Sequence, residues 1–206
     1  GKSPCIVEDD ANIKVAARRI VMTKFSNAGK MCVATDYILV QESKKESLVE
    51  AMKKVILQFF GDKPEESYNY GKIINEKQFN RLSNYLQQGN IVHGGRTVKE
   101  RLFIEPTIID NVNLDSDIMQ DEIFGPILPI ISFSTKEDAL KIITQHKNPL
   151  AFYVFTSSSV KEKDWLSSVA FGGGCVNNAS WHLTNHYLPF GGRGFSGSGQ
   201  YHGKYS

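Results

Sequence analysis

The sequence predicts an α/β domain in which helices cover both faces of a largely parallel, open sheet, giving three layers. Amphipathic helical segments alternate with short apolar, β-prone segments along the whole chain, and this alternation is typical of parallel sheets. No internal repeat or low-complexity segment interrupts it. With 206 residues, of which 41% are hydrophobic, the chain can form one domain with a sizeable core.

The elements of the first half can be assigned in order. Apolar residues recur at intervals of three and four between Asn12, which suits a helix N-cap, and Phe25, and Gly29 fits the end of that helix. Residues 37–40 are a short apolar run that predicts a buried strand. The segments expected next are a helix from Leu48 to Phe59 ended by Gly61, a polar loop over 62–70, a helix over about 75–88 and a strand at 91–92.

The second half continues the alternation. Residues 103–109 form one extended run, and residues 127–133 predict a strand. A helix is expected from 136 to about 145, followed by a strand at 151–155. The last elements are a serine-capped helix over 157–169 and a strand at 175–177 that is preceded by three glycines.

Cys32 lies in the connection between the first helix and the strand at 37–40, where backbone N–H groups can point at a ligand. A thiolate is the nucleophile that a thiol enzyme needs, and Lys30, two residues away, could favour the charged form of the sulfur. The alternative is structural, because a lone cysteine near a helix end is more often a small buried hydrophobe. The residues alone leave both interpretations open.

A second candidate site is the segment from Asp121 to Pro126, where a carboxylate stands beside an aromatic ring at a Gly-Pro turn. The Glu122 carboxylate could accept hydrogen bonds from ribose hydroxyls, and the Phe124 ring could pack on a flat ring of a ligand. The alternative is a turn with a solvated acidic pair and a packed phenylalanine. Chemistry alone favours that alternative.

Two further patterns do not predict a site. The glycine-rich stretch 191–199 lacks the strand-then-helix context and the Gly-Lys-Ser/Thr ending of a phosphate loop, so it predicts tight backbone packing near an active-site entrance. His182 and His186 are four residues apart, but no acidic or cysteine partner has a suitable spacing, and Pro189 argues against a long helix. We therefore expect no metal site.

Charge and cysteine content exclude several classes of protein. The net charge is +2 and neither sign forms a long block, so small molecules are expected partners and nucleic acid is not. Cys5, Cys32 and Cys175 form neither a disulfide framework nor a metal-ligand set, which favours a reducing compartment. No apolar run approaches the roughly 18 residues that span a bilayer, and we expect a soluble, cytoplasmic chain.

Several short motifs, far apart in the chain, together resemble the aldehyde dehydrogenase superfamily. Residues 27–29, 32–34 and 36–39 are similar to its catalytic-cysteine segment, and the pair Asp36-Tyr37 is similar to its class 3 branch. Lys30 and Asp121 depart from the family, which usually has Gln and Glu there. The other matching motifs occur in the family's order at residues 1–4, 106–107, 119–126, 148–151, 186–192 and 201–206, so the resemblance covers essentially the whole chain.

The resemblance implies that residues 1–206 are the thiol-bearing catalytic domain of a larger enzyme that uses NAD or NADP. A nucleotide-binding domain would then precede Gly1, together with the general-base glutamate and the amide that helps to hold the oxyanion. An oligomerisation element of a homodimer would follow Ser206. This chain alone should then be inactive.

By the same resemblance, Cys32 would be the catalytic nucleophile, Glu122 would hold the nicotinamide ribose and Phe124 would border the cofactor. The residues that would line the substrate pocket are Trp181, His182 and His186. The implied reaction is oxidation of medium-chain or aromatic aldehydes to carboxylic acids, through a thiohemiacetal and a thioester on Cys32. Two alternatives stay open: a relative that passes the acyl group to coenzyme A, and a non-catalytic structural or binding relative.

Overall fold

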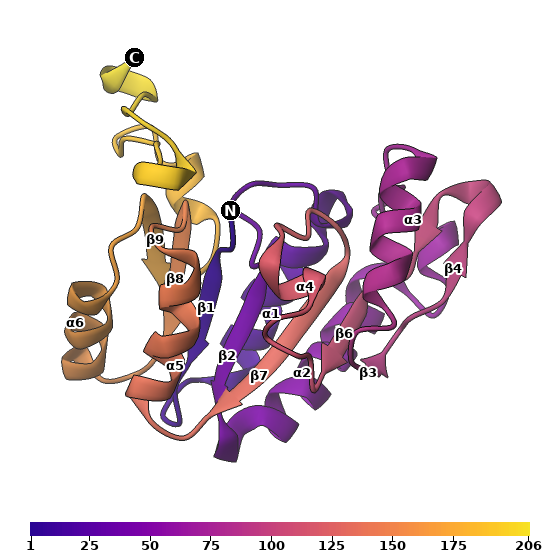
Figure 1. The fold of residues 1–206 in the computed structure, drawn as a ribbon, viewed down its shortest axis with the longest axis horizontal. Coiled ribbons are helices and arrows are strands. Elements are labelled where there is room, and N and C mark those ends of the chain that lie inside the picture. Colours follow the sequence, from indigo (N-terminus) through magenta and orange to yellow (C-terminus); the bar gives the residue numbers. More distant parts are fainter.

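The computed structural model describes residues 1–206, and its centre is an open sheet of seven strands (Figure 1). The strands lie in the order β3-β6-β7-β2-β1-β8-β9, and every neighbouring pair is parallel except β3 with β6. A separate two-stranded ladder joins β4 to β5. The strands are β1 (Pro4–Val7), β2 (Tyr37–Gln41), β3 (Asn90–His93), β4 (Thr97–Val98), β5 (Phe103–Ile104), β6 (Thr107–Asp110), β7 (Ile127–Phe133), β8 (Ala151–Phe155) and β9 (Gly173–Val176).

Helices cover both faces of the sheet, which confirms the three layers expected from the sequence (Figure 1). Two long helices pack against each other on one face, and the other four contribute to the core of the opposite face. No helix has both the length and the apolar character needed to cross a membrane. The helices are α1 (Ile13–Phe25) and α2 (Lys45–Phe60), then α3 (Glu76–Tyr85), α4 (Asp117–Gln120), α5 (Lys136–Ile143) and α6 (Ser159–Ser168).

Alternate residues of the central strands enter two separate cores, one on each face of the sheet. In β1, Cys5 and Val7 belong to the core under α1 and α2, whereas Ile6 belongs to the opposite core. In β8, Tyr153 belongs to the core under α1 and α2, and Phe152 belongs to the opposite core. Successive side chains of a strand point to opposite faces, so a strand buried on both sides is a continuous apolar run.

The end of α1 directs the chain toward the candidate nucleophile. Asn12 caps the start of the helix, because its side chain accepts a hydrogen bond from the Val15 N–H at 3.2 Å. Beyond the helix, Asn27, Ala28 and Gly29 have φ angles of 51°, 49° and 74°. These left-handed residues end the α-helical path and lead into the turn before β2.

The predicted elements are largely confirmed, but no strand at β1 or β4 and no helix at α4 is expected from the sequence. β1 nevertheless occupies the middle of the sheet. The run 103–109 is two strands in different sheets, because Glu105 and Pro106 interrupt it and proline has no N–H for a ladder. The helix predicted to reach 88 ends, as α3, at Tyr85.

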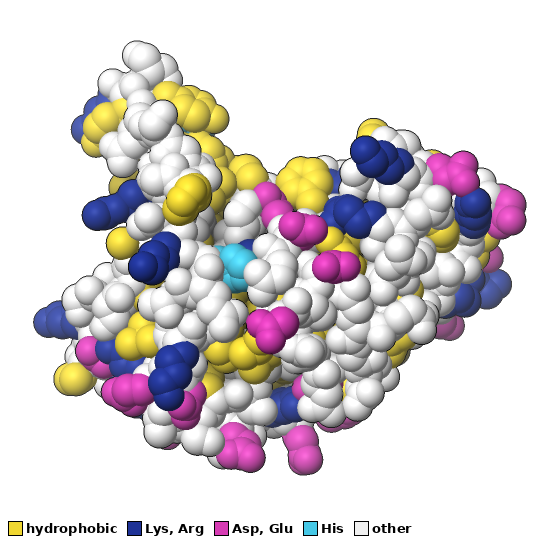
Figure 2. Space-filling view, viewed as in Figure 1, with side chains coloured by type: hydrophobic (Ala, Val, Ile, Leu, Met, Phe, Trp, Pro, Cys, Tyr) yellow, Lys and Arg dark blue, Asp and Glu magenta, His cyan; other side chains and the backbone are white.

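The surface is mixed in charge and has one projecting segment. On the face shown in Figure 2, basic and acidic side chains are interspersed, without a large area of one sign. The C-terminal segment, from Trp181 onward, projects beyond the sheet (Figure 1). It carries highly exposed aromatic side chains, including Tyr187 and Phe195.

Candidate functional site

Cys32 lies on an exposed turn at the edge of the sheet where the parallel strands begin. The Ala34 N–H donates to the Met31 carbonyl at 3.0 Å and closes a four-residue turn in which Cys32 is the second residue. This turn precedes β2, and the segment that carries Glu122 and Phe124 precedes β7, the parallel neighbour of β2. Because neighbouring strands run in the same direction, the two segments meet at the same edge.

Two glycines pack the Cys32 turn and the Glu122 segment together. A Cβ added at Gly29 would lie 2.2 Å from the carbonyl oxygen of Gly125, so only glycine permits this approach. Phe124, directly before Gly125, has a φ of 47° and a side chain that is 44% exposed. The close approach of Gly29 to Gly125 therefore brings the segments that carry Cys32, Glu122 and Phe124 together.

Arg81, on α3, holds the Glu122 segment from the other side. Its guanidinium donates to the carbonyl of Glu122 at 3.3 Å and to the carbonyl of Ile123 at 2.6 Å. It also donates to the Tyr85 hydroxyl at 2.9 Å. The sequence gives no sign of this role, because an arginine on an amphipathic helix predicts only a solvated side chain.

A buried ion pair fixes the start of the chain under the same edge. Lys2 Nζ lies 2.5 Å from an oxygen of Asp36, and both side chains are almost fully buried. Lys2 also donates to the Ile118 carbonyl at 2.6 Å, and the second Asp36 oxygen accepts from the Ile123 N–H at 3.1 Å. The pair therefore ties β1, the entry to β2 and the segment before β7 together.

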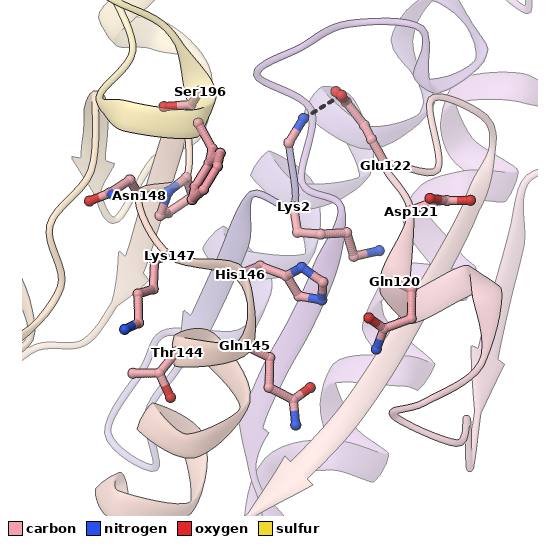
Figure 3. A pocket seen from close by; sticks show the side chains of 13 residues that line it. Lys2, Gln120, Asp121, Glu122, Thr144, Gln145, His146, Lys147, Asn148 and Ser196 are labelled. Carbon is pink, nitrogen blue, oxygen red and sulfur yellow. Dashed lines mark hydrogen bonds and ion pairs between the residues drawn. The ribbon is translucent and has the colours of Figure 1, made fainter.

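A polar cavity of about 380 Å³ opens beside Glu122. Figure 3 shows Glu122 on one wall, where its carboxylate accepts from the N-terminal ammonium of Gly1, with Ser196 opposite and His146 between them. The Glu122 side chain is 33% exposed, so its carboxylate can still meet a ligand. The cavity suits a polar ligand, because most of the side chains that line it are polar and Phe195 is the large apolar exception.

The three residues expected to line a substrate pocket are in different surroundings. His182 is buried, its Nδ1 lies 3.6 Å from the sulfur of Cys175, and burial lowers the pKa of His182. Trp181 is half-exposed beneath the guanidinium of Arg19. His186 is exposed, with its ring 5.2 Å from that of His202, and no hydrogen bond or ring contact joins it to the Cys32 turn.

Two lysines lie close to Cys32 in the sequence and differ in environment. Lys30 Nζ donates to the carbonyl of Lys72 at 2.6 Å, so its ammonium is engaged by a neighbouring loop. Lys24 is fully buried, its Nζ has no hydrogen-bond partner, and burial lowers the pKa of Lys24 to about 8. No three His, Cys, Asp or Glu side chains lie together as a metal site requires.

Comparison with known proteins shows the family of this chain. The family model described as "Aldehyde dehydrogenase family" matches residues 1–206. The chain belongs to the aldehyde dehydrogenase family. It is 48% identical to the 4,4'-diaponeurosporen-aldehyde dehydrogenase of Staphylococcus aureus and 42% identical to the dimeric NADP-preferring aldehyde dehydrogenase of Mus musculus.

The match covers 100% of this chain and 45% and 46% of those two relatives, so the chain spans about half the length of curated aldehyde dehydrogenases. Among solved aldehyde dehydrogenases, the substrate-bound state of the Staphylococcus aureus AldH superposes with a TM-score of 0.97 at 47% identity, over 100% of this chain and 45% of that one. An indole-3-acetaldehyde dehydrogenase complexed with NAD⁺ gives 0.87 at 29% identity, over 100% and 43%. The fold described above is that of the family.

Proposed function

We propose that this chain is the thiol-bearing catalytic domain of an NAD(P)-dependent aldehyde dehydrogenase that oxidises medium-chain or aromatic aldehydes to carboxylic acids. The observation that carries the proposal is the contact between Gly29 and Gly125, which joins the exposed Cys32 turn to the segment of Glu122 and Phe124. The mouse relative is a dimeric, NADP-preferring aldehyde dehydrogenase, which supports a dinucleotide cofactor and a homodimer.

Cys32 supplies the nucleophile in this proposal. Its thiolate forms a bond to the aldehyde carbon, and the backbone N–H of Cys32 donates to the oxyanion that develops. A nicotinamide held by Glu122 and Phe124 would supply the hydride acceptor, which would take two electrons with the hydride from the former aldehyde carbon and leave a thioester on Cys32. Water then hydrolyses the Cys32 thioester to the acid, with a general base and a second oxyanion donor from outside residues 1–206.

The residues present fit the nicotinamide end of such a cofactor. The partly exposed Glu122 carboxylate can accept hydrogen bonds from ribose hydroxyls, and the exposed Phe124 ring can border a flat heterocycle. The polar cavity beside Glu122 suits ribose and phosphate groups better than an apolar chain. Arg81 holds two carbonyls of this segment and so keeps Glu122 in place.

The aldehyde would enter on the side of the C-terminal segment. We place Trp181 and His182 on the wall of that entrance, because the His182 ring lies 6.0 Å from the ring of Tyr153, whose hydroxyl reaches the Cys32 turn. His186, exposed against His202, belongs to the outer rim in this proposal. Aromatic and aliphatic aldehydes both suit an entrance with these rings.

The test is aldehyde-dependent reduction of NAD and NADP by the full-length polypeptide, over a panel of aliphatic and aromatic aldehydes. We expect turnover by the wild type and loss of it in Cys32→Ser. Cys5→Ala, which removes a fully buried thiol that no ligand can reach, is the matched control and should stay active. With coenzyme A present, free acid should still be the product, and accumulation of acyl-CoA would favour the acylating alternative.

A further inference from the structure

We propose that Tyr153 is a positioning residue that fixes the Cys32 turn, an inference that rests on the proposed role of Cys32 as nucleophile. Tyr153 lies in the middle of β8, its side chain is fully buried, and its hydroxyl donates to the Val33 carbonyl at 2.6 Å. Val33 follows Cys32 directly. The contact joins residues 120 positions apart, so no local pattern in the sequence predicts it.

The hydrogen bond falls on the peptide that closes the turn. The peptide between Val33 and Ala34 has its N–H bonded to the Met31 carbonyl at 3.0 Å and its carbonyl bonded to the Tyr153 hydroxyl. It is therefore held at both ends. A rotation of the turn would break both hydrogen bonds and leave the buried Val33 carbonyl without a donor.

The phenol is suited to act as a permanent donor at this position. Burial raises the pKa of Tyr153 well above its ordinary value, so the hydroxyl keeps its proton throughout the working range of an enzyme. The Tyr153 ring also lies 6.0 Å from the ring of His182. Tyr153 thus links the Cys32 turn to the segment that carries Trp181 and His182.

The consequence for catalysis follows from the geometry of the turn. The direction of the Cys32 N–H and of the sulfur depends on the peptide planes of residues 31–34, and an oxyanion donor acts only when it points at the developing charge. Without the phenol, the turn samples other orientations and the reacting atoms are aligned for less of the time. A misplacement of this kind lowers kcat by about 10-fold to 100-fold, while cofactor binding at Glu122 is unaffected.

The experiment compares Tyr153→Phe with Tyr70→Phe in the full-length polypeptide. Tyr70 is the matched control, because its buried hydroxyl donates to the Ile104 carbonyl at 2.7 Å and makes no hydrogen bond to the Cys32 turn. Both variants lose one buried hydrogen bond, and we expect similar decreases in melting temperature. We expect kcat to fall about 10-fold or more in Tyr153→Phe alone, with an unchanged KM for the dinucleotide in both.

Iodoacetamide alkylation of Cys32, followed peptide by peptide in a mass spectrometer, is the second readout. The rate at Cys32 should change in Tyr153→Phe and stay at the wild-type value in Tyr70→Phe. Equal kcat and equal alkylation rates in the two variants would overturn the inference. If the wild type oxidises no aldehyde, the proposed function is wrong, and the alkylation comparison alone then decides whether Tyr153 holds the turn.

Discussion

The buried ammonium of Lys24 gives a quantitative test of the electrostatics beneath the site. Lys24 lies in the last turn of α1, is 0% exposed, and its Nζ has no hydrogen-bond partner. Burial lowers the pKa of Lys24 from 10.5 to about 8, an effect larger than the attraction of Asp36 and Glu122. The replacement Lys24→Met keeps an unbranched side chain and removes the charge.

We expect Lys24→Met to stabilise the folded state at neutral pH. The lowered pKa corresponds to a penalty of about 3 kcal/mol for burying the charged form. Between about pH 8 and the ordinary pKa of 10.5, the unfolded chain still holds the Lys24 proton and the folded chain has released it. Wild-type stability therefore rises over that window, and the advantage of the variant shrinks from about 3 kcal/mol to less than about 1 kcal/mol.

The assay is denaturant-induced unfolding of the full-length polypeptide at a series of pH values from neutral to alkaline. Lys14→Met, on the exposed side of the same helix, is the matched control and should leave the free energy of unfolding unchanged. Two results would refute the reasoning: equal stability of wild type and Lys24→Met at neutral pH, or a difference between them that stays constant as the pH rises.

Two further substitutions test the contacts around Glu122. Gly29→Ala places a Cβ 2.2 Å from the Gly125 carbonyl oxygen, whereas the control Gly61→Ala has nearly the same φ and places its Cβ in open space. In thermal unfolding, Gly29→Ala should be destabilised by about 1–3 kcal/mol more than Gly61→Ala. Equal losses of stability would contradict the close contact. Arg81→Gln removes the donors that hold the Glu122 carbonyl and should raise the KM for the dinucleotide several-fold, with kcat little changed. Steady-state kinetics with varied cofactor concentration measure both constants. A fall in kcat at constant KM would contradict this role of Arg81.

The elements that the sequence predicts correctly are those whose signals are local. α1 shows a helical period and a capping Asn12, and β8 is a short apolar run that is buried on both faces. Cys32 is equally local, because a helix end and a following strand place it in a connection. β1 is not predicted, although Cys5, Ile6 and Val7 form an apolar run as short as those of other predicted strands, and it is a central strand because β2 and β8 pair with it on either side.

The residues that hold the site in place could not be predicted in this way. Arg81 contacts carbonyls 41 and 42 positions away, and Tyr153 contacts one 120 positions away. Hydrogen bonds to backbone carbonyls depend on the position of the peptide and hardly at all on the identity of its residue. A sequence therefore records the donor, as an ordinary arginine or tyrosine, and leaves the acceptor unmarked.

The sequence by itself determined the α/β class, the alternation of elements and, through motifs such as those around Cys32 and Glu122, the family. These properties follow from residue types at short range, where periodicity and turn chemistry act. The tertiary structure decided that Gly29 rests on Gly125, that Tyr153 reaches the Cys32 turn and that Lys24 is buried without a partner. Those contacts depend on how parallel strands bring distant segments to one edge of the sheet, which no short stretch of sequence encodes.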